Sequence, residues 1–169
     1  EFLMKNIKDQ ENLSQKTVLL RLDLNVPLKN GVITDETRIV KIVPILNFLI
    51  EKKSKIIIIS HVGRPKGEFN KILSLKPICD NLEKKVKKKI QLLDDNIFKL
   101  KKKDLFKSPQ IQITILENIR FYKEEEKNDV FFAKHLASLA DLYVNDAFSC
   151  SHRSHASISC LLYTSDAAD

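Results

Sequence analysis

Residues 55–60 have the sequence KIIIIS, and this stretch decides the fold class. Four consecutive isoleucines leave no polar face, which is the pattern of a strand in a parallel sheet that helices cover on both sides. Further β-forming runs, TVLLRLDL, IQITILE and DLYV, occur at residues 17–24, 111–117 and 141–144. We expect these runs to be strands of the same sheet.

Amphipathic segments separate these runs. Residues 37–52 carry apolar side chains at the i, i+3, i+4 and i+7 spacing of a helix, and Pro44 is expected to kink that helix. Helix-start signals precede it at Thr34, Asp35 and Glu36. Two further helices are expected, with Ser74 as the cap of the first, at residues 74–86 and 129–140.

The remaining segments complete an alternating order of strands and helices. Residues 90–108 are expected to hold a short strand and then a lysine-rich helix, and Asn30-Gly31 after Pro27 predicts a turn. Such an order predicts βαβ units. We therefore expect a Rossmann-like parallel β-sheet flanked by helices on both faces, which is a three-layer α/β/α fold.

Length and composition limit the class of protein. The chain has 169 residues, and its hydrophobic fraction of 43% with a charged fraction of 30% is typical of one globular domain. No apolar run approaches the ~20 residues of a membrane-spanning helix, and the first residues lack a signal-peptide pattern. The 3 cysteines form no CxxC pair and suit a reducing compartment. We expect a cytoplasmic protein without a membrane partner.

Both ends of the chain differ from the rest. Residues 1–3 precede Met4, which is the first methionine, and residues 161–169 have no helix or strand period. We expect both segments to be non-native tails. Residues 4–160 are then the expected domain.

The arginines suggest a ligand site. The net charge of +7 comes from 29 basic and 22 acidic residues, and only five of the basic residues are arginines. Each lies near the C-terminal end of an expected strand or at the start of the next helix: Arg21, Arg38, Arg64, Arg120 and Arg153. Ligands of open parallel α/β sheets bind outside the carboxyl ends of the strands, and a guanidinium holds phosphate or carboxylate through two hydrogen bonds. The pattern predicts an anion site built from converging arginines.

The usual nucleotide-binding loops do not occur in the sequence. Its glycines are Gly31, Gly63 and Gly67, so neither GxxxxGK[ST] nor GxGxxG can be formed. An arginine-rich anion site without such a loop favours a non-nucleotide substrate. If the protein is a kinase, its nucleotide-binding half lies elsewhere.

The lysine clusters at residues 84–89 and 99–103 leave an alternative open. They are typical of solvated helix faces, because no aromatic residues interleave with them to stack on bases. The alternative is a non-catalytic basic module that binds nucleic acid or other polyanions. Binding of a small phosphorylated acid and of duplex DNA at increasing salt separates the two hypotheses.

Two further clusters favour ordinary structural roles. Cys150, His152 and His155 lack the spacing and the complete ligand set of a zinc site, and Cys150 is expected to be a buried thiol rather than a nucleophile. Glutamates at residues 124–126 precede an expected helix and would complement its dipole. No metal site is expected.

Five segments together resemble one known family: RLDLNVPLKNG, ITDETRI, ISHVGRPKGE, ILENIRFYKEEEKND and LASLADLYVNDAF…HRSHAS. They are similar, in register from Val18 to Ser157, to the amino-terminal domain of phosphoglycerate kinase. The resemblance implies the triose-binding half of a two-domain glycolytic kinase, truncated before the domain that binds MgADP or MgATP. It also implies a monomer with 3-phosphoglycerate and 1,3-bisphosphoglycerate as small-molecule substrates and no nucleic-acid partner.

The resemblance implies roles for individual residues. Asp23 and Asn25 match residues that hydrogen-bond the hydroxyl and carboxyl end of the glycerate. The residues implied to bind the 3-phosphate are His61, Arg64, Arg120 and Arg153. Arg38 matches the arginine that stabilises the phosphoryl group during transfer, which makes it the expected catalytic residue. No cofactor or metal would bind to this chain alone.

The implied reaction requires little covalent chemistry from the protein. Phosphoryl transfer depends mainly on positioning and on neutralising charge, so no general base is needed when the acceptor is a carboxylate. We expect the chain alone to bind the triose and to show no ATP-linked turnover. Ser149 stands where the family commonly has glycine, and a serine at positive φ would shift the loop that carries Arg153.

Overall fold

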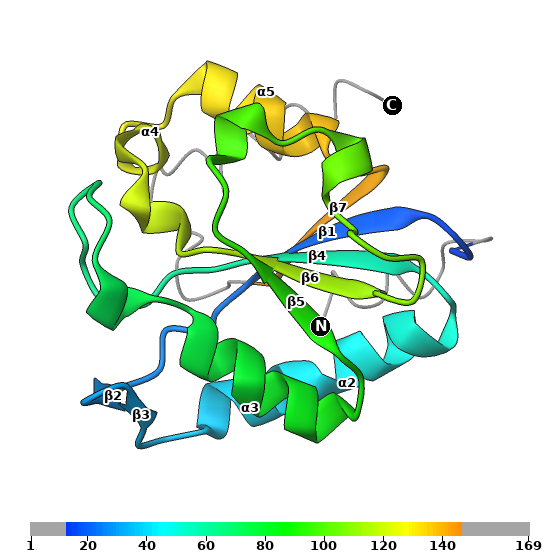
Figure 1. Cartoon of the computed structure of the whole chain (residues 1–169), viewed down its shortest axis with the longest axis horizontal. Helices are drawn as coiled ribbons and strands as arrows, with labels where there is room; N and C mark the ends of the chain where they lie inside the picture. Colours follow the sequence, from blue (N-terminus) through cyan, green and yellow to red (C-terminus); the bar gives the residue numbers. More distant parts are fainter. Residues whose placement is uncertain (1–12, 147–169) are drawn as a thin grey trace.

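The computed structural model describes residues 13–146 of the chain. Within them, the apolar runs form a parallel five-stranded sheet in the order β5-β6-β4-β1-β7 (Figure 1). Its strands are β1 (Thr17–Leu22), β4 (Lys55–Ile59), β5 (Ile90–Leu93), β6 (Ile113–Leu116) and β7 (Leu142–Asp146). The expected strands are therefore present, with ends that differ by one to a few residues from the predicted ones.

Both faces of the sheet are buried. Leu20 of β1 lies opposite Ile58 of β4 and belongs with it to one core, whereas Leu19 lies opposite Ile57 and belongs with it to the other. Successive side chains of a strand point to opposite faces, so a strand between two cores needs apolar residues at every position. The isoleucine run of β4 meets this requirement.

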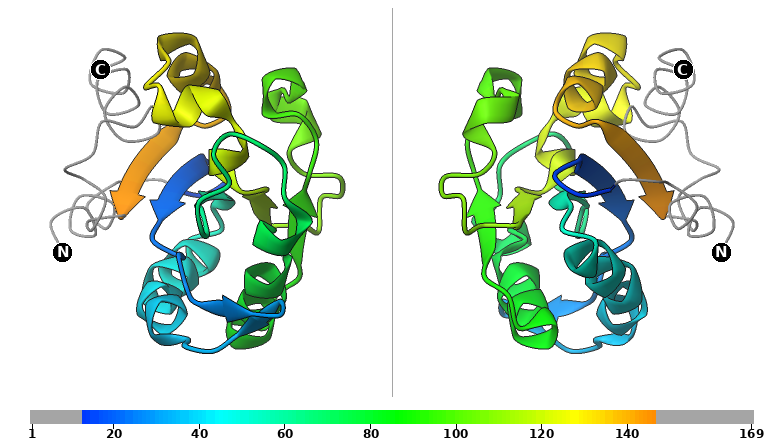
Figure 2. Two further views of the ribbon diagram at one scale, coloured as in Figure 1. Left: turned by 90° about the vertical axis from the view of Figure 1, so that its left-hand side faces the viewer. Right: turned by 90° about the vertical axis from the view of Figure 1, so that its right-hand side faces the viewer.

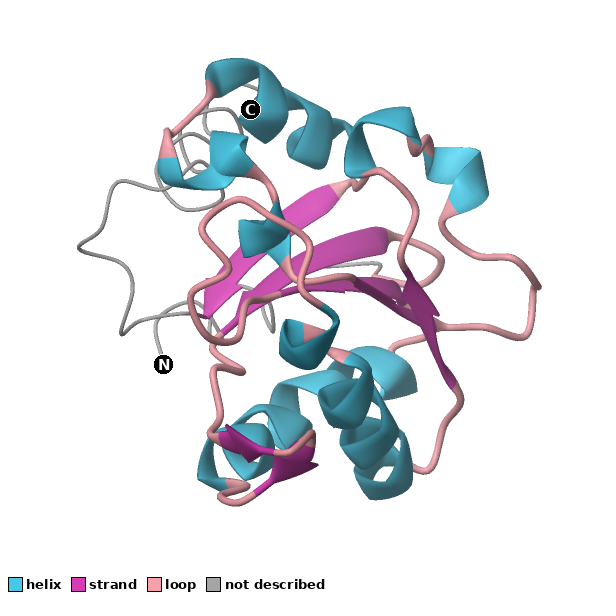
Figure 3. Ribbon diagram, turned by 60° about the vertical axis from the view of Figure 1, so that its left-hand side comes forward, coloured by secondary structure: helices cyan, strands magenta, loops and turns pink. Residues whose placement is uncertain are grey.

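Helices α2 (Thr37–Glu51) and α3 (Lys76–Val86) cover one face (Figures 1 and 3). Helix α2 continues past Pro44. At its start, Asp35 Oδ1 accepts hydrogen bonds from the hydroxyl and the backbone N–H of Thr37, at 2.6 and 2.8 Å. These bonds lower the pKa of the Asp35 carboxyl. The helix-start signal in the sequence is confirmed at Asp35.

The start of α3 corrects a prediction. The helix begins at Lys76, with Leu75 rather than Ser74 as its N-cap residue. Glu117, directly after β6, accepts the Leu75 N–H at 2.7 Å and the Ser74 hydroxyl at 2.6 Å. Ser74 Oγ accepts the Lys76 N–H at 3.1 Å, so the predicted cap still bonds the first residue of the helix, one position earlier than a standard N-cap. The contact with Glu117 joins distant residues and leaves no local signal.

The other face is covered by short elements. They are the 3-10 turns η2 (Ile97–Lys99), η3 (Lys102–Asp104) and η4 (Ile119–Phe121), and the helices α4 (Lys123–Glu126) and α5 (Val130–Ser138) (Figure 1). Asp129 Oδ1 accepts the Phe132 N–H at 2.9 Å at the start of α5. Helices thus lie on both faces, and the three-layer α/β/α fold is confirmed.

The lysine-rich helix expected after β5 is absent from its predicted place. Single 3-10 turns occur there, because Asn96 Oδ1 accepts the Phe98 N–H and Asp104 Oδ2 accepts the Lys101 N–H, at 2.9 and 3.0 Å. Side chains that bond nearby backbone groups in this way compete with the hydrogen bonds of an α-helix. The lysines at residues 101–103 are exposed, as expected for solvated side chains.

A small hairpin joins β1 to α2. Its strands are β2 (Leu28–Lys29) and β3 (Val32–Ile33), and they pair antiparallel. Asn30 and Gly31 connect them with φ values of 53° and 75°. Positive φ at both central residues is the requirement of a tight two-residue hairpin turn, which Asn-Gly satisfies. The predicted turn is confirmed.

The connections place one edge of the sheet in a favourable position for a ligand. The chain leaves β1 and β4 toward the α2 and α3 layer and leaves β6 toward the α4 and α5 layer (Figures 1 and 2). Adjacent β4 and β6 therefore diverge at their carboxyl ends, which is where open α/β sheets bind ligands. No helix among the described residues is long and apolar enough to cross a membrane.

Candidate functional site

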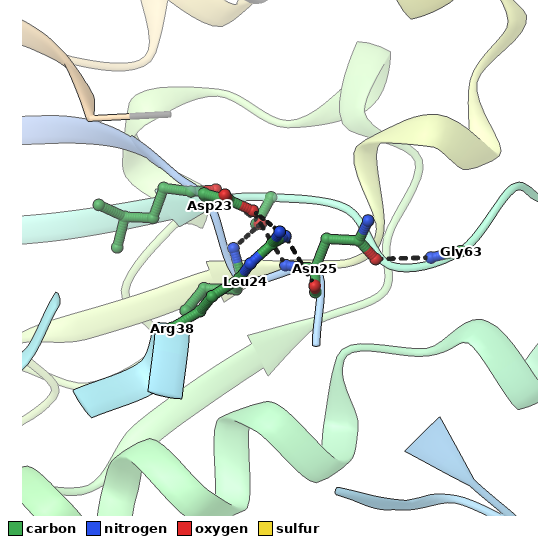
Figure 4. Close-up of polar contacts among 7 residues, drawn as sticks. Asp23, Leu24, Asn25, Arg38 and Gly63 are labelled. Atoms are coloured by element: carbon green, nitrogen blue, oxygen red, sulfur yellow. Dashed lines mark hydrogen bonds and ion pairs between the residues drawn. The ribbon is translucent and has the colours of Figure 1, made fainter. Parts of the chain in front are cut away.

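An arginine–carboxylate pair lies at the carboxyl end of β1. Arg38, in the first turn of α2, donates from Nη1 to Asp23 Oδ1 and to the Asn25 carbonyl oxygen, both at 2.9 Å (Figure 4). The Arg38 side chain is 46% exposed and the Asp23 side chain is 17% exposed. The guanidinium is therefore held at the edge of the sheet with much of its surface in solvent.

Two side chains tie the end of β1 to the end of β4. The Ser60 hydroxyl donates to the Leu22 carbonyl at 2.7 Å and accepts the Leu24 N–H at 3.1 Å. Asn25 Oδ1 accepts the Gly63 N–H at 3.1 Å (Figure 4). Because Leu24 bonds to a side chain instead of a neighbouring strand, β1 ends two residues earlier than predicted.

The loop after β4 depends on a glycine. Gly63 has φ of +63°, and a Cβ there would lie 2.6 Å from Cδ2 of Leu73. The positive φ favours glycine, and a side chain at this position would force Leu73 to move. His61, which precedes it, is buried, whereas Arg64, which follows it, is exposed. The loop thus holds one predicted site residue in the protein interior and presents the next to solvent.

The segment after β6 lies against this loop. Asn118 Oδ1 accepts the Arg120 N–H at 3.1 Å and caps η4. The Arg120 carbonyl accepts the Gly67 N–H at 3.1 Å, and Ile119 N–H donates to the Ser60 carbonyl at 3.0 Å. Arg120 is only 4% exposed. Direct hydrogen bonds therefore join the three segments that follow β1, β4 and β6.

The joined segments provide several cationic groups at one edge. Arg38 and Arg64 are exposed there, and the only acidic side chain bonded to them within residues 13–146 is Asp23. Arg120 is buried beside the loop that carries Arg64. Guanidinium groups in this arrangement can bind a phosphate or carboxylate with paired hydrogen bonds.

Comparison with known proteins identifies the family. A sequence profile described as phosphoglycerate kinase matches residues 7–167. The chain belongs to the phosphoglycerate kinase family. Its relatives include the phosphoglycerate kinase of Wolbachia pipientis wMel, 53% identical over 156 residues, and that of Dictyoglomus turgidum, 51% identical over 147 residues. These alignments cover 91% and 87% of the chain but 39% and 37% of the relatives.

Solved structures of the family share the fold. The phosphoglycerate kinase from Coxiella burnetii superposes with a TM-score of 0.79 at 39% identity, covering 90% of this chain and 38% of that one. The enzyme from Pyrococcus horikoshii OT3 gives 0.77 at 30% identity, covering 89% and 38%. The chain thus spans about two fifths of the length of the family members that it matches, and the predicted fold class and family are both confirmed.

Arg21 does not belong to the exposed part of the candidate site. It is an interior residue of β1, its side chain is fully buried, and its Nη2 lies 3.8 Å from Glu125 Oε1. Alternation along β1 directs it to the face that α4 covers. The expectation that all five arginines converge at one edge of the sheet is therefore wrong for Arg21.

Glu125 also corrects an expectation. Of the three glutamates expected only to complement a helix dipole, this one is fully buried and pairs with Arg21. Tyr143 lies on the same face, and burial raises the pKa of its hydroxyl. The acidic cluster thus contains a core residue that the sequence pattern does not single out.

Several predictions fall on residues outside 13–146, the part that the structure describes. They concern the tails at residues 1–3 and 161–169, and the residues Ser149, Cys150, His152, Arg153 and His155. Among the described residues, no three histidine, cysteine, aspartate or glutamate side chains gather in a way that could hold a metal ion. Cys79 is buried, which raises the pKa of its thiol to about 12.

Sequence reasoning missed the residues that organise the candidate site. Ser60, Glu117 and Asn118 each follow a buried strand and bond backbone groups of a distant segment. Polar residues directly after a buried strand were available as a signal. Their partners lie 36 to 56 residues away in the chain, so the sequence alone does not name them.

Proposed function

We propose that residues 4–160 form the triose-binding domain of a phosphoglycerate kinase. The whole enzyme would reversibly transfer a phosphoryl group from 1,3-bisphosphoglycerate to ADP, giving 3-phosphoglycerate and ATP in glycolysis. Support comes from the family of the chain and from the cationic edge at the ends of β1, β4 and β6. Family membership favours this hypothesis over a basic module that binds nucleic acid.

One observation carries the proposal. Arg38 is held by Asp23 and the Asn25 carbonyl, and the Asn25 side chain in turn holds the loop of Arg64. This network joins polar groups that follow β1 and β4, beside the point where the connections of β4 and β6 diverge. A small, multiply charged acid would find charge and directed hydrogen bonds at both of its ends there.

The residues divide into two groups for the triose. Asp23 and Asn25 would bond the hydroxyl and carboxyl end of the glycerate. The 3-phosphate would be bound by His61, Arg64, Arg120 and Arg153. Binding of this non-reacting phosphate would orient the carboxyl group, because energy from remote parts of a substrate can position the reacting centre. Small side-chain movements would bring the buried His61 and Arg120 to the ligand.

Arg38 would be the catalytic residue. It is the more exposed member of its pair with Asp23. Its remaining N–H groups would bond the phosphoryl group during transfer. Negative charge spreads over the equatorial oxygens in such a transition state, and an arginine at this point contributes ~10³–10⁵ in rate in other phosphoryl transferases. No covalent intermediate on the protein is required.

The nucleotide would bind to the part of the enzyme beyond this chain. Phosphoglycerate kinases use a magnesium complex of ATP or ADP, which supplies or accepts the phosphoryl group. The described residues do not fit such a group, since they hold neither a glycine-rich phosphate loop nor a cluster of metal-binding side chains. The chain alone would bind the triose without turnover. We propose the whole enzyme to be a cytoplasmic monomer.

Thermal unfolding with and without 3-phosphoglycerate tests the proposal. A ligand that binds only the folded chain raises the midpoint, so we expect a saturable increase. Arg64→Ala should weaken binding about tenfold or more, since it removes a bidentate phosphate contact. Lys103→Ala is the matched control, because it removes the same charge from a lysine cluster.

Two results would contradict the proposal. The first is equal binding of 3-phosphoglycerate by the Arg64 and Lys103 variants. The second is the absence of triose binding together with salt-sensitive binding of duplex DNA that Lys103→Ala reduces, which would favour the basic module.

A further inference from the structure

Asn118 occupies a central position behind the proposed phosphate site. It follows β6 by two residues, and its side chain is completely buried. Family membership does not by itself assign a role to it. Its contacts, however, connect the two segments that carry Arg64 and Arg120.

The Asn118 amide makes three hydrogen bonds to three separate pieces of backbone. Nδ2 donates to the carbonyl oxygens of Val62 and Leu73, both at 2.9 Å, and Oδ1 accepts the Arg120 N–H at 3.1 Å. An amide has two N–H donors and one oxygen acceptor. Both donors and the acceptor of Asn118 are therefore used.

Each of these partners is adjacent to the proposed site. Val62 lies between His61 and Gly63, two residues before Arg64. The side chain of Leu73 occupies the space that a Cβ on Gly63 would enter. The Asn118 amide therefore bonds the backbone of the Arg64 loop and the backbone of Leu73, whose side chain packs on that loop. It also bonds the backbone N–H of Arg120.

We propose that Asn118 is a positioning residue for the anion site, acting on the ligand through the loop of Arg64 and through Arg120. This inference rests on the proposed function and deepens it. Asn118 is buried and would not contact the triose. Its amide would set the distance between the guanidinium groups of Arg64 and Arg120, which bind the same phosphate in the proposed function. Bidentate hydrogen bonds depend on this geometry.

The fold does not depend on Asn118 alone. Backbone hydrogen bonds from Ile119 to Ser60 and from Gly67 to Arg120, at 3.0 and 3.1 Å, join the same segments. Loss of the amide should therefore misplace the loop without separating it from β6. This permits a test in which the chain stays folded.

Asn118→Asp is the informative variant. It keeps the size of the side chain and the acceptor for Arg120, but it replaces the donor by an oxygen that faces two carbonyl groups. Isothermal titration of the 169-residue chain with 3-phosphoglycerate should show affinity reduced about tenfold or more, since a buried donor has been lost and its acceptors are left unsatisfied.

Gln112 offers a matched control at the opposite end of the same strand. Its Nε2 also donates to two backbone carbonyls, those of Ile50 at 3.1 Å and Ser54 at 2.8 Å. Gln112→Glu makes the same chemical change far from the arginines. We expect it to lower the unfolding midpoint while leaving the affinity for 3-phosphoglycerate within about twofold of the original chain.

The pH dependence separates positioning from general destabilisation. A protonated carboxyl group at position 118 can again donate one hydrogen bond, so the ratio of the two dissociation constants, variant to original, should decrease as the pH is lowered from 8 to 5. Taking the ratio cancels the titration of the ligand phosphate. Destabilisation alone would leave this ratio unchanged while both chains stay folded.

The outcomes are distinct. Equal affinity of the Asn118 variant and the original chain, with the original chain binding, overturns the positioning role and leaves the proposed function intact. Equal losses of affinity in the Asn118 and Gln112 variants also overturn it. Absence of binding by a folded original chain overturns both proposals.

Discussion

Two arginine–carboxylate pairs of this chain have the same chemical groups but lie in different surroundings. Arg21 and Glu125 are fully buried and lie 3.8 Å apart, whereas Arg38 and Asp23 lie 2.9 Å apart with side chains 46% and 17% exposed. Removing one member of a buried pair leaves the other charge in the protein interior without its counter-charge. Solvent screens the exposed pair, and its arginine keeps N–H groups that a ligand can reach. The fold therefore depends on keeping both members of the interior pair, whereas the edge pair is exposed where a ligand can reach it.

The largest expected effect is on the interior pair. Glu125→Gln keeps the size of the side chain but leaves the Arg21 charge buried opposite a neutral group. We expect the free energy of unfolding to decrease by about 3–5 kcal/mol. Urea unfolding of the chain measures this change. The matched variant Asp23→Asn should cost less than about 1 kcal/mol, and similar losses in both variants would contradict the distinction.

The difference between these pairs also explains which parts of the structure were predictable. The isoleucines of β4 and the apolar stripe of α2 report burial through local periodicity, so the layered fold followed from the sequence. Arg21 lies within β1, and alternation along the strand directs its side chain to the layer that contains α4. Its buried partner, Glu125, comes from a distant part of the chain, which the local pattern around Arg21 does not reveal.

The candidate site was predictable only in part. Arg38 and Arg64 were expected at the carboxyl edge of the sheet, and they are exposed there. The supporting contacts of Glu117 and Asn118 were not expected, because each bonds segments more than forty residues away in the chain. Composition and periodicity describe which side chains are buried. They do not describe which backbone groups a buried polar side chain satisfies.

The edge pair should show a smaller effect with a different dependence on salt. Arg38→Ala is expected to change the free energy of unfolding by less than about 1 kcal/mol, because an exposed pair contributes little. At ~1 M NaCl the Debye length falls to about 3 Å, so this contribution should disappear, while the loss in Glu125→Gln should persist. Urea unfolding at low and high salt compares the two. A large decrease in the free energy of unfolding in Arg38→Ala that does not depend on salt would contradict this distinction between the edge pair and the interior pair.

The smallest effect is expected at the amino end of the sheet, where Asp141 provides a third kind of pair. Its Oδ2 accepts a hydrogen bond from the Thr17 N–H and its Oδ1 accepts one from Lys102 Nζ, both at 2.9 Å, with the Asp141 side chain 36% exposed. The bond from the Thr17 backbone, followed by that from Lys102, lowers the pKa of the Asp141 carboxyl below its usual value of 3.8.

A lowered pKa in the folded state fixes the direction of the pH effect at Asp141. The ionised carboxylate stabilises the fold above the unfolded pKa of 3.8, and this contribution is lost as the pH falls through the lower folded value. Asp141→Asn should therefore cost a few tenths of a kcal/mol to about 1 kcal/mol at pH 7 and nothing near pH 2. Urea unfolding across this range measures the difference, with Asp80→Asn, from the exposed pair with Lys76 on α3, as the control. A cost in Asp141→Asn that is constant with pH would show that shape rather than charge joins β1 to β7, and would separate this carboxylate from both arginine pairs.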